Sequence, residues 1–142
     1  MTQRRQTHNE HLARINQVIH RIHSDLASPL DINSLAETAC YSIHHFQRIF
    51  KVLTGESVHD YIRRARLEWT ANLLVFNPHT QIAEVAAECG FQSTASFTHA
   101  FKAHFGYTPG VWRNRGFEHE SQKMKAALVA ASGNPHSRYY QS

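Results

Sequence analysis

The chain has 142 residues, of which 42% are hydrophobic and 18% are charged. This composition provides a packed interior and argues against a disordered chain. The net charge of +4 favours an anionic partner. The two cysteines form no CxxC pair, and the longest apolar run, residues 126–131, is too short to cross a bilayer. We therefore expect a soluble, cytoplasmic protein.

Apolar residues recur with the period of amphipathic helices along most of the chain. In chain order, this pattern predicts helices over residues 8–26, 32–39, 43–53, 58–76, 82–89 and 94–105, and a short helix after Thr108. Suitable residues to begin the later helices are Asp31, Ser42, Ser57, Thr80, Ser93 and Thr108, and glycines end several of them. No segment alternates with period two, so the predicted fold class is all-α with about seven helices.

One phrase of the sequence occurs twice. FQRIFKVLTG at residues 46–55 returns as FTHAFKAHFG at residues 97–106, with Phe, Phe, Lys and Gly at the same internal spacing. The preceding residues also match, at an offset of 50 up to Tyr41 and of 51 from Ser42 onward. A repeat of this length implies that one supersecondary unit is used twice.

The repeated unit is predicted to be a helix, a tight turn and a second helix. Its first helix carries a small residue, Ala36 or Ala86, where another helix must cross closely, and its second helix carries Phe at i and i+4. This is the pattern of a helix-turn-helix, whose second helix enters the major groove of DNA. The sequence therefore predicts two DNA-reading helices and double-stranded DNA as the partner.

The outward faces of these two helices differ. The first presents His44, Gln47, Arg48 and Lys51, and the second presents Ala95, Thr98, His99 and Lys102. Arginine pairs with guanine and glutamine with adenine, whereas alanine and threonine offer weaker methyl contacts to thymine. Two different faces predict an asymmetric DNA site.

Charge is segregated along the chain in a way that suits DNA. Residues 31–39 and 80–89 carry acidic residues and no Lys or Arg, whereas the bases gather on the expected DNA side: Arg48, Lys51, Arg63, Arg64, Arg66, Lys102, Arg113 and Arg115. The predicted helix over 58–76 would span about 28 Å. Successive major-groove faces lie about 34 Å apart, so we expect a monomer to cover both.

The segments 35–74 and 82–113 resemble the DNA-binding domain of the AraC/XylS transcription regulators. The resemblance covers about residues 8–115 and implies two helix-turn-helix units joined by a long helix, which bind adjacent major grooves. It also implies activation of transcription through RNA polymerase. By position, it implies that His44, Gln47, Arg48, Ala95, Thr98 and His99 contact bases, and that Ser42, Lys51, Arg63, Lys102 and Arg113 contact phosphates. One departure is His99, where such proteins commonly have Arg.

On this basis we expect a first helix-turn-helix subdomain over 8–56, a connecting helix over 57–77 and a second subdomain over 78–115. Residues 116–142 would form an extension that is partly helical, over 119–131, or disordered. Most members of the family add a sensing domain, which does not fit here. The chain is expected to be either a short stand-alone regulator or the N-terminal part of a longer one with a C-terminal effector domain.

Other functions are less well supported by the residues. No nucleophile–base pair, Gly-rich phosphate loop or paired carboxylates indicate an enzyme or a cofactor. The twelve histidines include no HExxH and have no Cys or carboxylate at ligand spacing, so we predict no metal site. The main alternative is a helical protein-interaction module anchored by Trp69, Trp112 or Tyr139–Tyr140, although both tryptophans are expected in the core. RNA binding is disfavoured because the aromatic residues are predicted to face inward.

Histidines lie on or beside both predicted DNA-reading faces, at His44, His45 and His99. Because imidazole gains its charge in mildly acidic solution, we expect tighter DNA binding at about pH 6 than at about pH 8. The cysteines, Cys40 and Cys89, are expected to be small buried residues.

Overall fold

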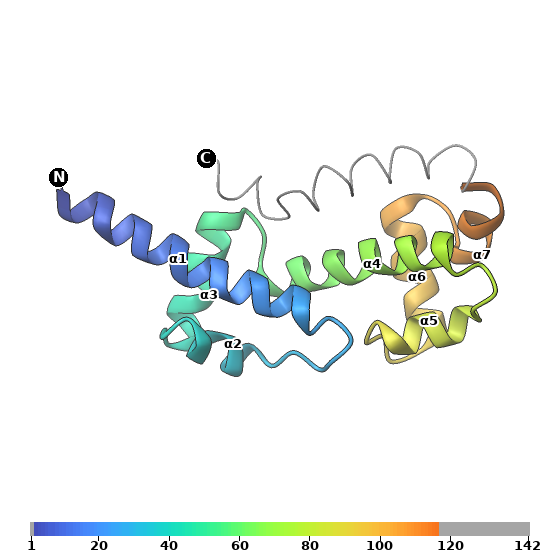
Figure 1. Ribbon diagram of the computed structural model, residues 1–142, viewed down its shortest axis with the longest axis horizontal. Coiled ribbons are helices and arrows are strands. Elements are labelled where there is room, and N and C mark those ends of the chain that lie inside the picture. The colour runs from blue at the N-terminus through green and yellow to red at the C-terminus, as the bar shows by residue number, and fades with distance from the viewer. Residues whose placement is uncertain (1, 117–142) are drawn as a thin grey trace. The chain divides into compact units, whose positions relative to one another are not determined.

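The computed structural model describes residues 2–116 (Figure 1). These residues form α1 (Thr2–Ser24), α2 (Ile32–Thr38), α3 (Ile43–Thr54), α4 (Val58–Phe76), α5 (Ile82–Glu88), α6 (Thr94–Phe105), α7 (Pro109–Val111) and a π-helical turn, η1 (Trp112–Gly116). No strand occurs among them, so the predicted all-α class with about seven helices is confirmed. The expected helix over 119–131, Tyr139–Tyr140, His119 and His136 lie outside the described residues.

Capping residues explain where the short helices begin and end. Asp31 accepts hydrogen bonds from the backbone N–H groups of two residues of α2, Ser42 caps α3 and Ser93 caps α6 in the same way. Gly55 and Gly106 end α3 and α6 with φ of 82° and 84°, a left-handed conformation that favours glycine. These predicted boundaries are confirmed.

Three local predictions were wrong. Helix α1 starts at Thr2 rather than at residue 8, because its polar first turns carry no apolar stripe that could indicate a helix. Gln81, without a side-chain hydrogen bond, precedes α5 in place of the predicted cap Thr80. Phe76, the last apolar residue of the amphipathic helix predicted over 58–76 and therefore expected to face inward, is 59% exposed.

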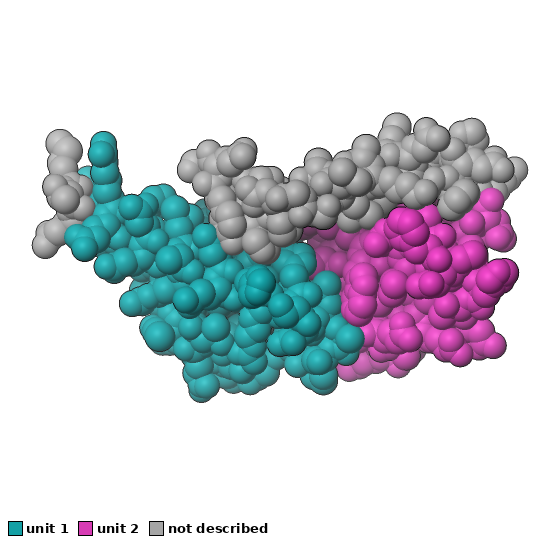
Figure 2. Space-filling model, in the orientation of Figure 1, with its two compact units in different colours: residues 1–62, 136–142 teal, residues 63–135 magenta. Residues whose placement is uncertain are grey.

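The described residues divide into two compact units, which Figure 2 shows in different colours. Unit 1 includes α1 to α3 and the start of α4 up to Ile62, and unit 2 runs from Arg63 through the rest of α4 to η1. The division thus falls within α4. The expected subdomain bounds of 8–56, 57–77 and 78–115 stay a prediction.

In unit 1, α1 contacts both α2 and α3. The ring centroids of Phe46 and Phe50, both buried on α3, lie 5.8 Å apart, and Tyr61 packs edge-on at 5.4 Å from Phe50. The hydroxyl of Tyr61 also forms a 2.8 Å hydrogen bond with Nε2 of His23. The aromatic cluster therefore fixes the inner face of α3.

Unit 2 has a core of the same design. Its buried residues come from α4, α5, α6 and η1: Leu67, Ala71, Leu74, Val75, Val85, Ala86, Cys89, Phe97, Ala100, Phe101 and Trp112. The indole N–H of Trp112 donates to the carbonyl of Ala71 at 3.2 Å, and Trp69 packs against the same core. Both tryptophans thus serve the core, as predicted, rather than a protein-binding surface.

The structure extends the internal repeat further upstream than the sequence comparison did. Buried residues of α1 and α4 correspond at an offset of 52, namely Ile15, Ile19 and Ile22 with Leu67, Ala71 and Leu74. Both units therefore share an arrangement of three corresponding helices, in which α1 or α4 supports a helix-turn-helix. None of these three pairs is identical, so comparison of the sequence with itself did not reveal the correspondence.

The turns of the two units differ at one backbone position. Cys40 has φ of 60°, and its counterpart at an offset of 50, Gly90, has φ of 83°. Cys40 is exposed, so the expectation that both cysteines are buried was wrong for it, because a left-handed residue in a tight turn points its side chain outward. Cys89 is buried, and burial raises the pKa of its thiol to about 12.

We predict that Cys40→Gly stabilises the protein. A side chain in the left-handed region costs roughly 1–2 kcal/mol, and the extra freedom of glycine in the unfolded chain offsets about half of that gain. The free energy of unfolding measured by urea denaturation should therefore rise by roughly 0.5–1 kcal/mol.

Gly90→Ala provides the opposite case. A Cβ at Gly90 would lie 2.9 Å from Cζ of Arg66 and would occupy a left-handed backbone, so this variant should be less stable than the wild-type protein. If Cys40→Gly were as destabilising as Gly90→Ala, the left-handed geometry assigned to Cys40 would be wrong.

Candidate nucleic-acid interface

Helix α3 carries the first set of predicted base-contacting residues on the face opposite its buried phenylalanines. His44 and Arg48 are exposed, and Gln47 is half-buried. Lys51 continues the same exposed face one turn further along. No acidic residue occurs in α3. The structure therefore brings together hydrogen-bond donors and positive charge on one accessible helical surface in unit 1.

The first turn of α3 supplies a further donor. Oγ of Ser42 accepts a 3.3 Å hydrogen bond from the backbone N–H of His45. As an acceptor in the cap, the hydroxyl keeps its own proton for donation to an anion. Ser42 is exposed, so a phosphate can reach it.

A shallow groove of about 370 Å³ runs beside this surface of unit 1. It is lined by residues from the end of α3 and the start of α4: Gln47, Arg48, Lys51, Val52, Ser57, Val58 and His59. Sequence reasoning missed this groove, because it depends on how the turn at Gly55 returns the chain past α3.

Helix α6 presents the second set in unit 2. Phe97 and Phe101 are buried, whereas Ala95 and His99 are exposed and Thr98 is half-buried. Lys102 is exposed near the end of the helix. This face carries fewer side-chain donors than that of α3.

Ser93 is the structural counterpart of Ser42, and sequence reasoning did not include it among the phosphate contacts. Its Oγ accepts a 3.0 Å hydrogen bond from the backbone N–H of Ser96, and the side chain is exposed. The offset of 51 in the repeat was the signal that could have identified it.

Several basic residues expected on the DNA side have partners within the protein. Nη1 of Arg64 lies 3.0 Å from Oε1 of Glu68. The guanidinium of Arg66 lies over Gly90, and burial lowers its pKa. Arg113 is half-buried and donates to the carbonyl of Thr80. Arg63, the predicted phosphate contact on α4, is exposed.

An aromatic cluster occupies the turn of the helix-turn-helix in unit 1. The hydroxyl of Tyr41 is hydrogen-bonded to Nδ1 of His11, and the guanidinium carbon of Arg14 lies 5.3 Å from the Tyr41 ring centroid. The ring of His45 packs on Tyr41 at 4.9 Å. Burial raises the pKa of Tyr41, which stays a neutral phenol. His45 therefore supports the turn, whereas His44 is the histidine on the exposed face.

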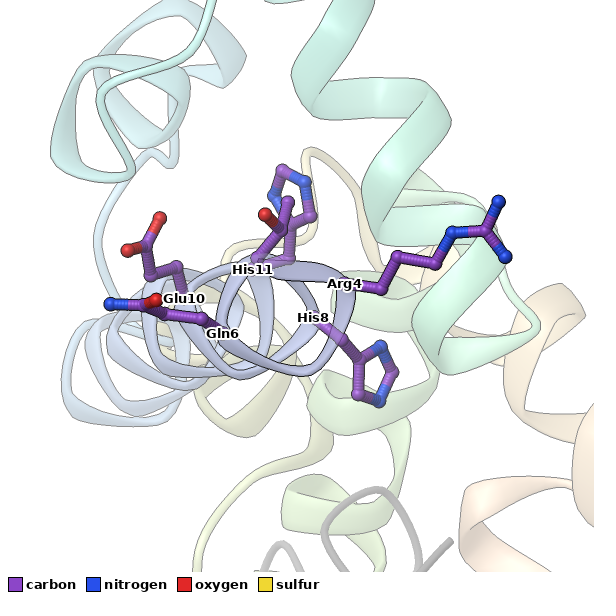
Figure 3. Close-up of a pocket in the computed structure, with 6 residues that line it drawn as sticks. Arg4, Gln6, His8, Glu10 and His11 are labelled. Carbon is purple, nitrogen blue, oxygen red and sulfur yellow. The ribbon is translucent and has the colours of Figure 1, made fainter. Parts of the chain in front are cut away.

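The start of α1 does not form a second site. Figure 3 shows that the labelled side chains from Arg4 to His11 spread in different directions around the helix instead of converging. Across residues 2–116, no three His, Cys, Asp or Glu side chains gather closely enough to hold a metal ion. In the same part of the chain, no helix has the length and hydropathy needed to span a membrane.

Comparison with known proteins agrees with this geometry. A family model described as a helix-turn-helix domain matches residues 35–115. The multiple antibiotic resistance protein MarA of Salmonella typhimurium is 33% identical over 110 residues, which cover 78% of this chain and 86% of MarA. The Msm operon regulatory protein of Streptococcus mutans is 36% identical over 101 residues, 71% of this chain.

A solved structure of the DNA-binding domain of AdpA, a global transcriptional factor in complex with a target DNA, has 27% identity and a TM-score of 0.64. The match covers 70% of this chain and 88% of that one. The chain spans only 36% of the length of the Streptococcus mutans protein. The relatives and the fold are those of non-enzymatic proteins that bind DNA. The chain belongs to the AraC/XylS family of DNA-binding transcription regulators.

Proposed function

We propose that this protein binds an asymmetric site on double-stranded DNA as a monomer, with α3 and α6 in adjacent major grooves. The observation that carries this proposal is that each of these helices buries two phenylalanines and exposes a polar face, and that the two faces differ. The DNA complex of the related AdpA domain supports the docking of such a fold on a duplex. Helix α4 has 19 residues, which corresponds to a helix length of about 28 Å.

In this proposal, α3 supplies most of the sequence preference. Arg48 donates to O6 and N7 of a guanine, and Gln47 pairs with an adenine. His44 lies one turn earlier on the same face. On α6, the side chains of Ala95, Thr98 and His99 are shorter than that of Arg48 and carry fewer hydrogen-bond donors. Unit 2 therefore discriminates less between bases.

Phosphate contacts hold the reading helices in register. Exposed side chains that can provide them are Ser42, Lys51, Arg63 and Lys102. Arg113 also contributes, because its guanidinium has five N–H donors and can bind the carbonyl of Thr80 and a phosphate together. Activation through RNA polymerase rests on the family resemblance alone.

We predict that selection of bound duplexes from a random pool gives a non-palindromic consensus. One half should be strongly defined, because α3 carries Gln47 and Arg48, and the other half should tolerate more substitutions. Sequencing of the selected pool measures both properties. A palindromic consensus would contradict binding by one monomer through two different helices.

We predict that Arg48→Ala weakens binding to the selected site by roughly 1–3 kcal/mol and removes preference at one base pair. Because the side chain of Arg48 is exposed, we expect the variant to keep its fold, and circular dichroism with thermal unfolding would check this. Fluorescence anisotropy with the four base-pair variants at each position measures the preference. His99→Ala is the matched change in α6, at an offset of 51, and should cost less.

Lys51→Ala should behave differently from Arg48→Ala. Loss of a phosphate contact weakens binding to all duplexes about equally and reduces the slope of log K against log salt by roughly 1. Titrations of the selected duplex and a random duplex between low and moderate salt measure this effect. A change in base preference with an unchanged salt slope would assign Lys51 to a base instead.

A further inference from the structure

An apolar side chain is exposed on the basic surface of unit 1. Val52, near the end of α3, is 72% exposed, and it lines the groove together with Lys51, Arg48 and His59. Val58, at the start of α4, also lines the groove but is buried at 1% exposure, so Val52 provides the accessible apolar surface. The groove therefore combines apolar surface with a cationic rim.

The position of the groove determines what can reach it once α3 is bound to DNA. An α-helix with its side chains is about 10–12 Å in diameter, which nearly fills a major groove about 12 Å wide. Protein surface directly beside such a helix meets the sugar–phosphate wall rather than base edges. The groove shares Gln47 and Arg48 with the base-contacting face, so it lies directly beside that face.

The chemistry of the lining matches that of a DNA backbone. No acidic residue lines the groove, and Asp60, the acidic residue in the first turn of α4, is not part of it. Lys51 and His59 are exposed at the rim and can approach a phosphate. Val52 offers apolar contact to a deoxyribose, the least polar part of the backbone.

We propose that this groove binds one sugar–phosphate segment of the DNA backbone, with the deoxyribose against Val52 and the phosphate near Lys51 and His59. The inference rests on the proposed docking of α3 in the major groove. It adds Val52 and His59 to the DNA contacts and assigns the start of α4 a direct part in binding.

Val52→Glu tests this proposal, because a carboxylate in the groove would repel the phosphate. The full chain should bind the selected duplex and a random duplex about tenfold more weakly, with unchanged base preference. Ala13→Glu on α1 is the matched control, since Ala13 is also exposed in a helix of unit 1 and gives the same change in net charge. Its binding should remain within about twofold of the wild-type value.

Duplexes with a single uncharged methylphosphonate linkage locate the contact. In the wild-type protein, one such linkage beside the bases preferred through Arg48 should weaken binding, and His59→Ala should reduce the effect of that linkage because Lys51 alone would remain near the phosphate. Equal affinities of Val52→Glu and Ala13→Glu would overturn the groove assignment while leaving the proposed function intact.

Two other outcomes also decide the matter. Normal DNA binding by Val52→Glu with loss of activation by purified RNA polymerase would assign the groove to a protein partner and overturn the proposal. If selection from the random pool yielded no duplex that the wild-type chain binds, both the groove assignment and the proposed function would be overturned.

Discussion

The paired phenylalanines on the second helix of each helix-turn-helix are the interaction on which the rest of the structure depends. Their ring centroids lie 5.8 Å apart in α3 and 5.6 Å apart in α6, and all four side chains are buried. Residues one turn apart share a helical face, so burying these rings fixes the opposite face toward solvent. The residues that can contact DNA are therefore set by the aromatic core.

The basic residues of this chain divide between two tasks. Arg66 packs over the turn at Gly90, Arg64 pairs with Glu68, and Arg113 binds the carbonyl of Thr80. These contacts lie within unit 2, and the ion pair between Arg64 and Glu68 neutralises one positive charge that could otherwise meet phosphate. On α3 and α6, by contrast, the side chains of Arg48, Lys51 and Lys102 are exposed.

The two units show how one scaffold accommodates different turns. In unit 1, Tyr41 supports the turn and its hydroxyl is hydrogen-bonded to His11. In unit 2, the ring centroid of Phe91 lies 5.1 Å from that of Phe97. The hydroxyl of Tyr41 needs a hydrogen-bond partner, which His11 on α1 provides, whereas the apolar ring of Phe91 needs only packing against the core of unit 2. Different contacts therefore stabilise corresponding turns in the two units.

The sequence by itself determined the helical class, most helix boundaries and the duplicated helix-turn-helix, because periodicity, capping residues and left-handed glycines act over a few neighbouring residues. It also determined which face of α3 is exposed, since Phe46 and Phe50 mark the buried one. Only the tertiary structure decided that Cys40 is exposed and that Arg66 lies over Gly90. It alone placed Val52 beside His59 in a groove. These features arise from contacts between separate helices and from the path of the turns, which the local pattern of residues does not specify.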